Sequence, residues 1–341
     1  MTLTRLRGLS LAALGAVSAC GAPGGGATPV DGAPPWADAV VADDRPIINQ
    51  DYVPYLVGEL ARVYQPSGDR YLNDHALARG PDGVWHLYGI NAATRGTPQL
   101  ERTFLHATAT SLIGPWTELP DVLDAADEPT KEVLWAPFVL DRGGGRWSMY
   151  YWGGVSGSTD APARGTRRAD TGDLRAFTRV PGRVPGGRDP FVLRVDDRWL
   201  LYSVGADAQA RGQIVVSETR TPDDVTSWSA PVAILTDPVP SYPWGNVESP
   251  YVVPYAGRYY LFVTRVGPPS PEHVAAYDRT LVFRSADPAR YEWRAITEMR
   301  AHAAEVLEAD GAYYLTSGGW SAEVGPKARG LSIAPMRWAP Q

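Results

Sequence analysis

The chain has 341 residues, of which 44% are hydrophobic and 21% charged, and its net charge of −6 at neutral pH is spread without any basic run. Such a chain can bury a large core, and the lack of clustered Lys and Arg argues against a nucleic-acid partner. Thirty-five glycines, 31 prolines and the lack of long segments at helical period indicate an all-β chain with many turns.

The first 20 residues have the features of an export signal. Arg5 and Arg7 give it a positively charged start, and the apolar run Leu9–Val17 is too short to span a bilayer. Val17-Ser18-Ala19-Cys20 resembles a bacterial lipoprotein processing site, and Cys20 is the only cysteine. We therefore expect an exported cell-envelope lipoprotein, held at the outer or cytoplasmic membrane only through a lipidated Cys20. A plain secretory signal is the alternative.

Residues 21–49 are rich in Gly, Pro and Ala, a composition typical of a flexible tether. Residues 50–341 form the predicted folded domain, which we expect to be a monomer.

Within that domain a turn followed by alternating aromatic and aliphatic residues occurs five times. The fourth residues of the copies stand at 85, 147, 199, 259 and 313, so the successive gaps are 62, 52, 60 and 54 residues. Repeats of this length and pattern predict the blades of a five-bladed β-propeller. The last blade shows only three strands, and we expect the segment Tyr52–Tyr64 to add a fourth and close the ring. The copies are Asp82–Tyr88, Gly144–Tyr150, Asp196–Tyr202, Ala256–Phe262 and Asp310–Thr316.

Ten or eleven residues before each aromatic, in the strand that should begin the blade, the chain places mostly ionisable side chains. The positions hold Asp74, Ala136, Asp189, Glu248 and His302. The first strand of each blade lines the central channel of a propeller, so these side chains should converge. Buried carboxylates are costly in an apolar wall, and a cluster of them favours a chemical use.

The motifs around these positions resemble those of the five-bladed glycoside hydrolases. Trp135-Ala136-Pro137, Glu248-Ser249-Pro250-Tyr251 and the closing Ala334-x-x-x-Trp338 resemble the arabinanases and xylosidases of family 43. Asn73-Asp74 and Arg188-Asp189-Pro190 are similar to motifs of the β-fructosidases of family 32. Some features depart from these patterns. His75 stands where both families usually carry proline, and Ser249 follows Glu248 where family 32 usually has cysteine. We also expect no second β-sandwich domain of the kind that family 32 enzymes normally have. The substrate therefore stays open.

The resemblance implies hydrolysis of furanosidic or pentosyl linkages of the arabinan, xylan or fructan type. Asp74 would be the base or nucleophile, Glu248 the general acid, and Asp189 would stabilise the transition state and tune the acid. We favour inversion of configuration, as in family 43, with Asp74 acting on water. Taken singly, the three acids could instead be a turn cap, a strand start and a solvated strand end.

Other residues are candidates for binding. Trp135 and Trp244 could stack on sugar rings or simply pack in the core, and Arg188 and His75 are candidate substrate contacts. By resemblance His302 could help to bind a structural calcium ion near the channel axis; alternatively it is a hydrogen-bonded core histidine. Glu305, three residues further on, should point to the opposite face of its strand and have a structural role. No cofactor is required for the proposed hydrolysis.

Two other functions are compatible with the same residues. A transferase or phosphorylase on this fold would keep the three carboxylates but exclude water or hold a phosphate. A non-catalytic carbohydrate-binding propeller is the other alternative, if the three acids do not converge.

The lipoprotein signal yields the first testable prediction. Cys20→Ser should release the protein from the membrane fraction of the producing cell, because no other lipidation site is expected and lipid chains supply the anchor. Cell fractionation and immunoblotting measure the release. Membrane association that survives the substitution would contradict the lipoprotein hypothesis.

Overall fold

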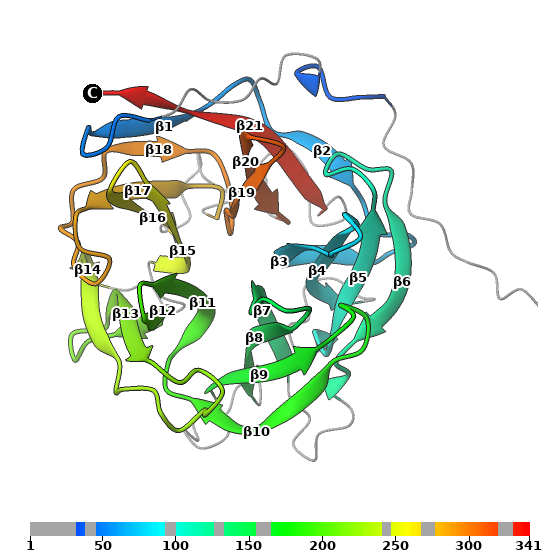
Figure 1. Ribbon diagram of the computed structural model, residues 1–341, viewed down its shortest axis with the longest axis horizontal. Helices are drawn as coiled ribbons and strands as arrows, with labels where there is room; N and C mark the ends of the chain where they lie inside the picture. Colours follow the sequence, from blue (N-terminus) through cyan, green and yellow to red (C-terminus); the bar gives the residue numbers. More distant parts are fainter. Residues whose placement is uncertain are drawn as a thin grey trace, which may run out of the picture.

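The computed structural model describes residues 32–37, 46–92, 100–125, 133–154, 165–240, 247–266, 277–319 and 330–341. These residues form five antiparallel sheets arranged in a ring around one axis (Figure 1). The predicted all-β, five-bladed β-propeller is therefore confirmed. The predicted leader, with Cys20, lies outside the described residues. Within the described ranges no helix has the length and apolar character needed to cross a bilayer.

Four blades are each made of four strands that follow one another in the chain. Blade one comprises β3 (Tyr71–Arg79), β4 (Trp85–Ala92), β5 (Thr103–Ala109) and β6 (Thr117–Val122). Blade two comprises β7 (Val133–Asp141), β8 (Trp147–Gly154), β9 (Gly165–Thr171) and β10 (Thr178–Val184). Blade three comprises β11 (Arg188–Val195), β12 (Arg198–Ala206), β13 (Arg211–Thr219) and β14 (Val232–Pro240). Blade four comprises β15 (Val247–Tyr255), β16 (Arg258–Arg265), β17 (Thr280–Ser285) and β18 (Thr297–Met299).

The repeated aromatic motif forms the second strand of each blade, which is covered on both faces by neighbouring blades. Every residue of β4 and β8 is buried, as expected for strands packed between two layers. The motif also joins blades through hydrogen bonds. Tyr88 Oη donates to the carbonyl of Leu174 in blade two, and Tyr202 Oη donates to the carbonyl of Pro288 in blade four, at 2.5 and 3.0 Å. The repeat thus supplies both core volume and contacts between blades.

Blade five joins the first and the last strands of the propeller. Its strands β19 (Val306–Ala309), β20 (Ala312–Gly318) and β21 (Leu331–Pro340) are completed by β1 (Tyr52–Leu56) and β2 (Ala61–Tyr64), which both pair with β21. The predicted closing segment therefore does close the ring, as a strand interrupted between β1 and β2. Gln341 N donates to the carbonyl of Asp51 at 2.9 Å and extends this pairing.

Part of the predicted tether contacts the propeller. Trp36 is 5% exposed, its indole N–H donates to the carbonyl of Glu59 at 3.1 Å, and its ring lies 6.4 Å from that of Tyr314. Residues 32–37 are therefore docked on blade five by the indole.

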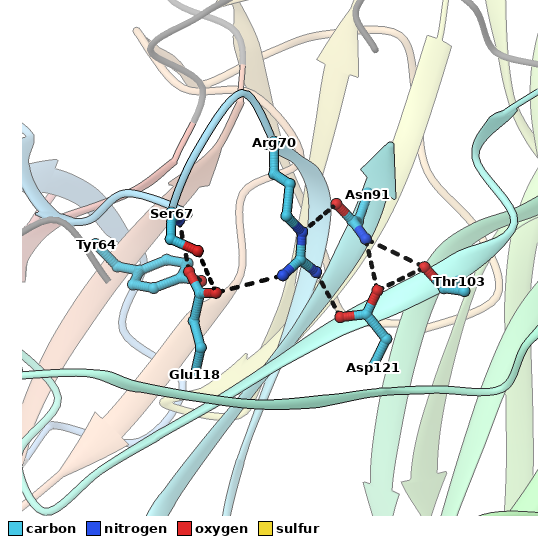
Figure 2. Close-up of polar contacts among 7 residues, drawn as sticks. All are labelled: Tyr64, Ser67, Arg70, Asn91, Thr103, Glu118 and Asp121. Atoms are coloured by element: carbon cyan, nitrogen blue, oxygen red, sulfur yellow. Dashed lines mark hydrogen bonds and ion pairs between the residues drawn. The ribbon is translucent and has the colours of Figure 1, made fainter. Parts of the chain in front are cut away.

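A polar network spans the seam between the closing strand and blade one (Figure 2). Glu118 of β6 accepts hydrogen bonds from Tyr64 Oη at 3.0 Å, from Ser67 N at 2.6 Å and from Ser67 Oγ at 2.8 Å. Arg70 lies between Glu118, 3.3 Å away, and Asp121, with which it also pairs. We call this network the seam clasp, and Asn91 and Thr103 complete it by hydrogen bonding to each other and to Asp121.

Glu118→Ala should destabilise the propeller. The substitution removes three hydrogen bonds and one ion pair from a side chain that is 7% exposed, and we expect a loss of about 2–3 kcal/mol in the free energy of unfolding. Urea titration followed by tryptophan fluorescence measures it. The matched control is Glu218→Ala, which removes an exposed pair with Arg198 and should cost less than about 1 kcal/mol. Equal losses in the two variants would contradict the role of the clasp.

Candidate active site

The three predicted acids lie at one end of the channel. Asp74, Asp189 and Glu248 stand near the amino ends of β3, β11 and β15, which are the innermost strands of their blades. We call this end the mouth. Because each blade is antiparallel, second and fourth strands end at the mouth and third strands begin there.

Innermost strands carry an extra residue close to these acids. The ladder between first and second strands slips between Leu72 and His75, and at the corresponding points of the next three blades. Asp189 and Ser249 have φ of 56° and 50°, a left-handed conformation that is unfavourable for residues other than glycine. Ala136 and Ala303 show the same feature, with φ of 47°. Such a bulge interrupts the alternation of side chains, so that two consecutive residues can face the mouth.

The bulge explains why the three acids meet without being equivalent in the ladder. Asp74 lies five residues before Arg79, which pairs with Trp85, and Asp189 lies five before Arg194, which pairs with Trp199. Glu248 lies six residues before Pro254, which pairs with Tyr259. Glu248 therefore occupies the ladder position of Arg188, and Ser249 that of Asp189.

Each acid has a defined partner. His302 Nε2 lies 2.8 Å from Asp74 Oδ1, and both terminal nitrogens of Arg188 donate to Glu248 Oε1 at 3.1 Å. Ser249 N donates to Asp189 Oδ2 at 3.1 Å. Blades one and five are thus connected through Asp74, and blades three and four through the other two acids.

Burial and neighbouring charges give the three carboxyl groups different pKa values. Burial raises the pKa of Glu248 to about 7; Arg188 opposes this shift, and the charges of Asp189 and Asp74 add to it. Burial also raises the pKa of Asp189, although Arg188 opposes it. For Asp74, burial is outweighed by the hydrogen bond and charge of His302, so that its pKa lies below the ordinary value. Near neutral pH the mouth therefore holds an ionised Asp74 and a partly protonated Glu248.

Arg188 is the cation shared by this cluster. Burial alone would lower its pKa, but the charges of Asp189, Glu248 and Asp74 raise it above the ordinary value. Its side chain remains partly open to solvent, with 28% exposed. Arg188 thus balances the carboxyls and still presents a surface to the mouth.

Two of the other predicted binding residues, His75 and Trp135, contact neighbouring protein side chains. His75 is buried and its Nε2 lies 2.6 Å from Thr316 Oγ1; burial lowers its pKa to about 3, so the ring is neutral. Trp135 is stacked on Trp152 of the neighbouring strand, with ring centres 4.9 Å apart. Trp244 lies outside the described residues.

For the predicted calcium ion the described ranges supply few ligands. Among them no group of three or more His, Cys, Asp or Glu side chains could hold a metal ion. His302 and Asp74 are bonded to each other, and the described residues add no third protein ligand. The calcium ion stays a prediction.

Two residues near the cluster were not predicted. Glu305 was expected on the opposite face of its strand, yet it lines a cavity of about 40 Å³ together with Asp74 and Asp189. Its Oε2 accepts from Leu77 N at 3.1 Å, and burial raises its pKa to about 8. The left-handed Ala303 precedes it and breaks the alternation on which the expectation rested. Tyr277, whose ring lies edge-on to His302 at 5.8 Å, carried no motif in the sequence.

The fold is shared with known carbohydrate-active enzymes. A family 43 (GH43_1) enzyme from Xanthomonas citri, solved with xylotriose, superposes with a TM-score of 0.61 at 16% identity, over 82% of this chain and 89% of that one. A family 43 β-xylosidase/α-arabinofuranosidase from a compost metagenome gives 0.58 at 16%, over 83% and 95%. A family 117 glycoside hydrolase from Zobellia galactanivorans gives 0.56 at 12%, over 86% and 91%. No protein-family profile and no curated protein matches the sequence.

Asp189→Asn should lower the pKa of Glu248 below its value of about 7, because the substitution removes a neighbouring negative charge. Infrared difference spectra of the carboxyl band between pH 4 and pH 9, assigned with Glu248→Gln, measure the shift. Asp207→Asn, at a carboxylate that pairs with Arg211 between β12 and β13, is the control and should leave the titration of Glu248 unchanged. A pKa of Glu248 that stays or rises in Asp189→Asn would contradict the charge coupling described above.

Proposed function

We propose that this protein is a glycoside hydrolase that cleaves furanosidic or pentosyl linkages. The observation that carries the proposal is the contrast between Asp74, which is held ionised by His302, and Glu248, whose pKa is about 7. Hydrolysis of a glycosidic bond needs one ionised and one protonated carboxyl on opposite sides of that bond. The likeness in fold to family 43 and family 117 enzymes supports the same reaction class.

The favoured mechanism inverts the anomeric centre. Glu248 donates its proton to the leaving oxygen as the bond from that oxygen to the anomeric carbon breaks. A water attacks the carbon from the other side and gives a proton to Asp74. Asp189 contributes negative charge beside the developing oxocarbenium ion and helps to keep Glu248 protonated. His302 orients Asp74 through the 2.8 Å hydrogen bond.

The substrate class rests on chemistry and on fold neighbours together. The Xanthomonas citri enzyme was solved with xylotriose, and the compost enzyme is named as a β-xylosidase/α-arabinofuranosidase. We therefore propose xylosyl and arabinofuranosyl linkages as the first to test. Arg188, whose side chain is partly exposed, is the proposed contact for a sugar hydroxyl.

Glu248→Gln and Asp74→Asn should lower kcat by about 10²–10⁴-fold on natural oligosaccharides, because each variant loses one proton-transfer group. The two variants should differ on aryl glycosides. A dinitrophenyl leaving group departs without protonation, so Glu248→Gln should recover most of its rate, whereas Asp74→Asn should not.

Initial rates on xylosyl and arabinofuranosyl substrates with good and poor leaving groups measure this contrast. Glu218→Gln, an exposed carboxylate of blade three, is the control that should keep full activity. An equal loss of rate in Glu248→Gln with both leaving groups would contradict the role of Glu248 as the general acid. If the wild type hydrolyses no glycoside, the proposed function is refuted.

A further inference from the structure

A cleft of about 510 Å³ separates blades four and five. One wall carries Arg62 of β2, Ser317 of β20 and Ser332 of β21. The other wall carries Asp278 and residues 297–300, which include β18. We call this space the interblade cleft. Its volume falls within the roughly 300–1,000 Å³ typical of sites for small ligands.

The interblade cleft begins beside the catalytic cluster. Ser317 Oγ accepts a hydrogen bond from His302 N at 3.0 Å, and the ring of His302 is bonded to Asp74. Ser317 lies near the end of β20 and Ser332 near the start of β21, so both stand at the mouth end of blade five. One layer of side chains thus separates the interblade cleft from the carboxyls of the mouth.

Its opposite wall is at the mouth as well. Met299 of β18 pairs with Thr280, the first residue of β17, which begins at the mouth. Tyr277 places its ring edge-on to His302, and the next residue, Asp278, lines the interblade cleft. A chain-like ligand that leaves the mouth past Tyr277 therefore reaches this wall.

The lining suits a neutral saccharide. Arg62 Nε donates to Ser332 Oγ at 3.3 Å, and Arg300 pairs with Asp278 at 3.4 Å. The lining therefore carries both cations and carboxylates. Sugar hydroxyls donate to carboxylates and accept from guanidinium groups, and both are present here. Tyr55 and Leu60 add apolar surface, against which the C–H face of a sugar ring can pack.

We propose that the interblade cleft binds further units of the saccharide whose linkage lies at the mouth, so that the substrate is an oligosaccharide or polysaccharide. This inference rests on the proposed function, because the linkage at the mouth decides which sugar units reach the interblade cleft. The binding itself is a separate property of the interblade cleft.

The turnover experiment uses three variants. Asp278→Ala and Arg300→Ala remove polar contacts, and Thr297→Trp fills the interblade cleft; all three positions line the cleft. Each should raise KM on arabinan or arabinoxylan by roughly tenfold, with kcat/KM on the 4-nitrophenyl glycosides changed less than about twofold. Arg198→Ala, which breaks a similar exposed pair in blade three, is the control and should change neither. Equal effects on long and short substrates, or no effect on the polysaccharide, would overturn the proposal.

Binding without turnover separates this inference from the proposed function. Affinity electrophoresis of Glu248→Gln in gels containing arabinan, arabinoxylan or β-1,3-galactan should show retardation by at least one glycan. Adding Asp278→Ala or Thr297→Trp should abolish that retardation, and Arg198→Ala should preserve it. Retardation that persists in the cleft variants, or none with any of the three glycans, would overturn the cleft site. Retardation in a protein that hydrolyses no glycoside would overturn the catalytic proposal alone.

Discussion

The charge of Arg188 among buried carboxyls is the interaction on which the mouth depends. Three acids within reach of one another would repel strongly in a desolvated site, and a buried ion without a partner costs several kcal/mol. Arg188 binds Glu248 directly and adds positive charge beside Asp189 and Asp74. The left-handed backbone at Asp189 lets Arg188 and its neighbour face the same space. Backbone strain at one residue thus allows a charge arrangement that a regular strand would not.

Much of the architecture could be predicted from the sequence, because each copy of the turn and aromatic strand indicates both a hairpin and a buried strand of the core. The same motif also fixes the number of blades, and the unpaired last blade pointed to Tyr52–Tyr64. The convergence of Asp74, Asp189 and Glu248 at one end was equally predictable. Counting residues back from the aromatic finds the correct segment of the first strand even where a bulge changes the register.

His302 was expected beside the acids, but which side chain each acid pairs with could not be predicted. Arg188 and Glu248 are 60 residues apart, and Asp74 and His302 are 228 apart, so neither pair leaves a local pattern. The predicted orientation of Glu305 was wrong for a related reason. Strict alternation of side chains fails where a residue such as Ala303 adopts positive φ, and an alanine side chain does not indicate that conformation. Backbone irregularity therefore limits prediction most where the chemistry is concentrated.

The origin of blade five from both ends of the chain has a consequence for folding. Tyr52 pairs with Pro340, so the ring is completed by the first and the last strands of the described propeller. Contacts of such long sequence separation form slowly, because the loop they close is nearly the whole domain. Blades one to four have only local pairings and can assemble earlier, as an open arc. A nascent or truncated chain that lacks β21 would keep the edge of that arc unprotected, and chaperones that bind exposed strands would have their longest opportunity there.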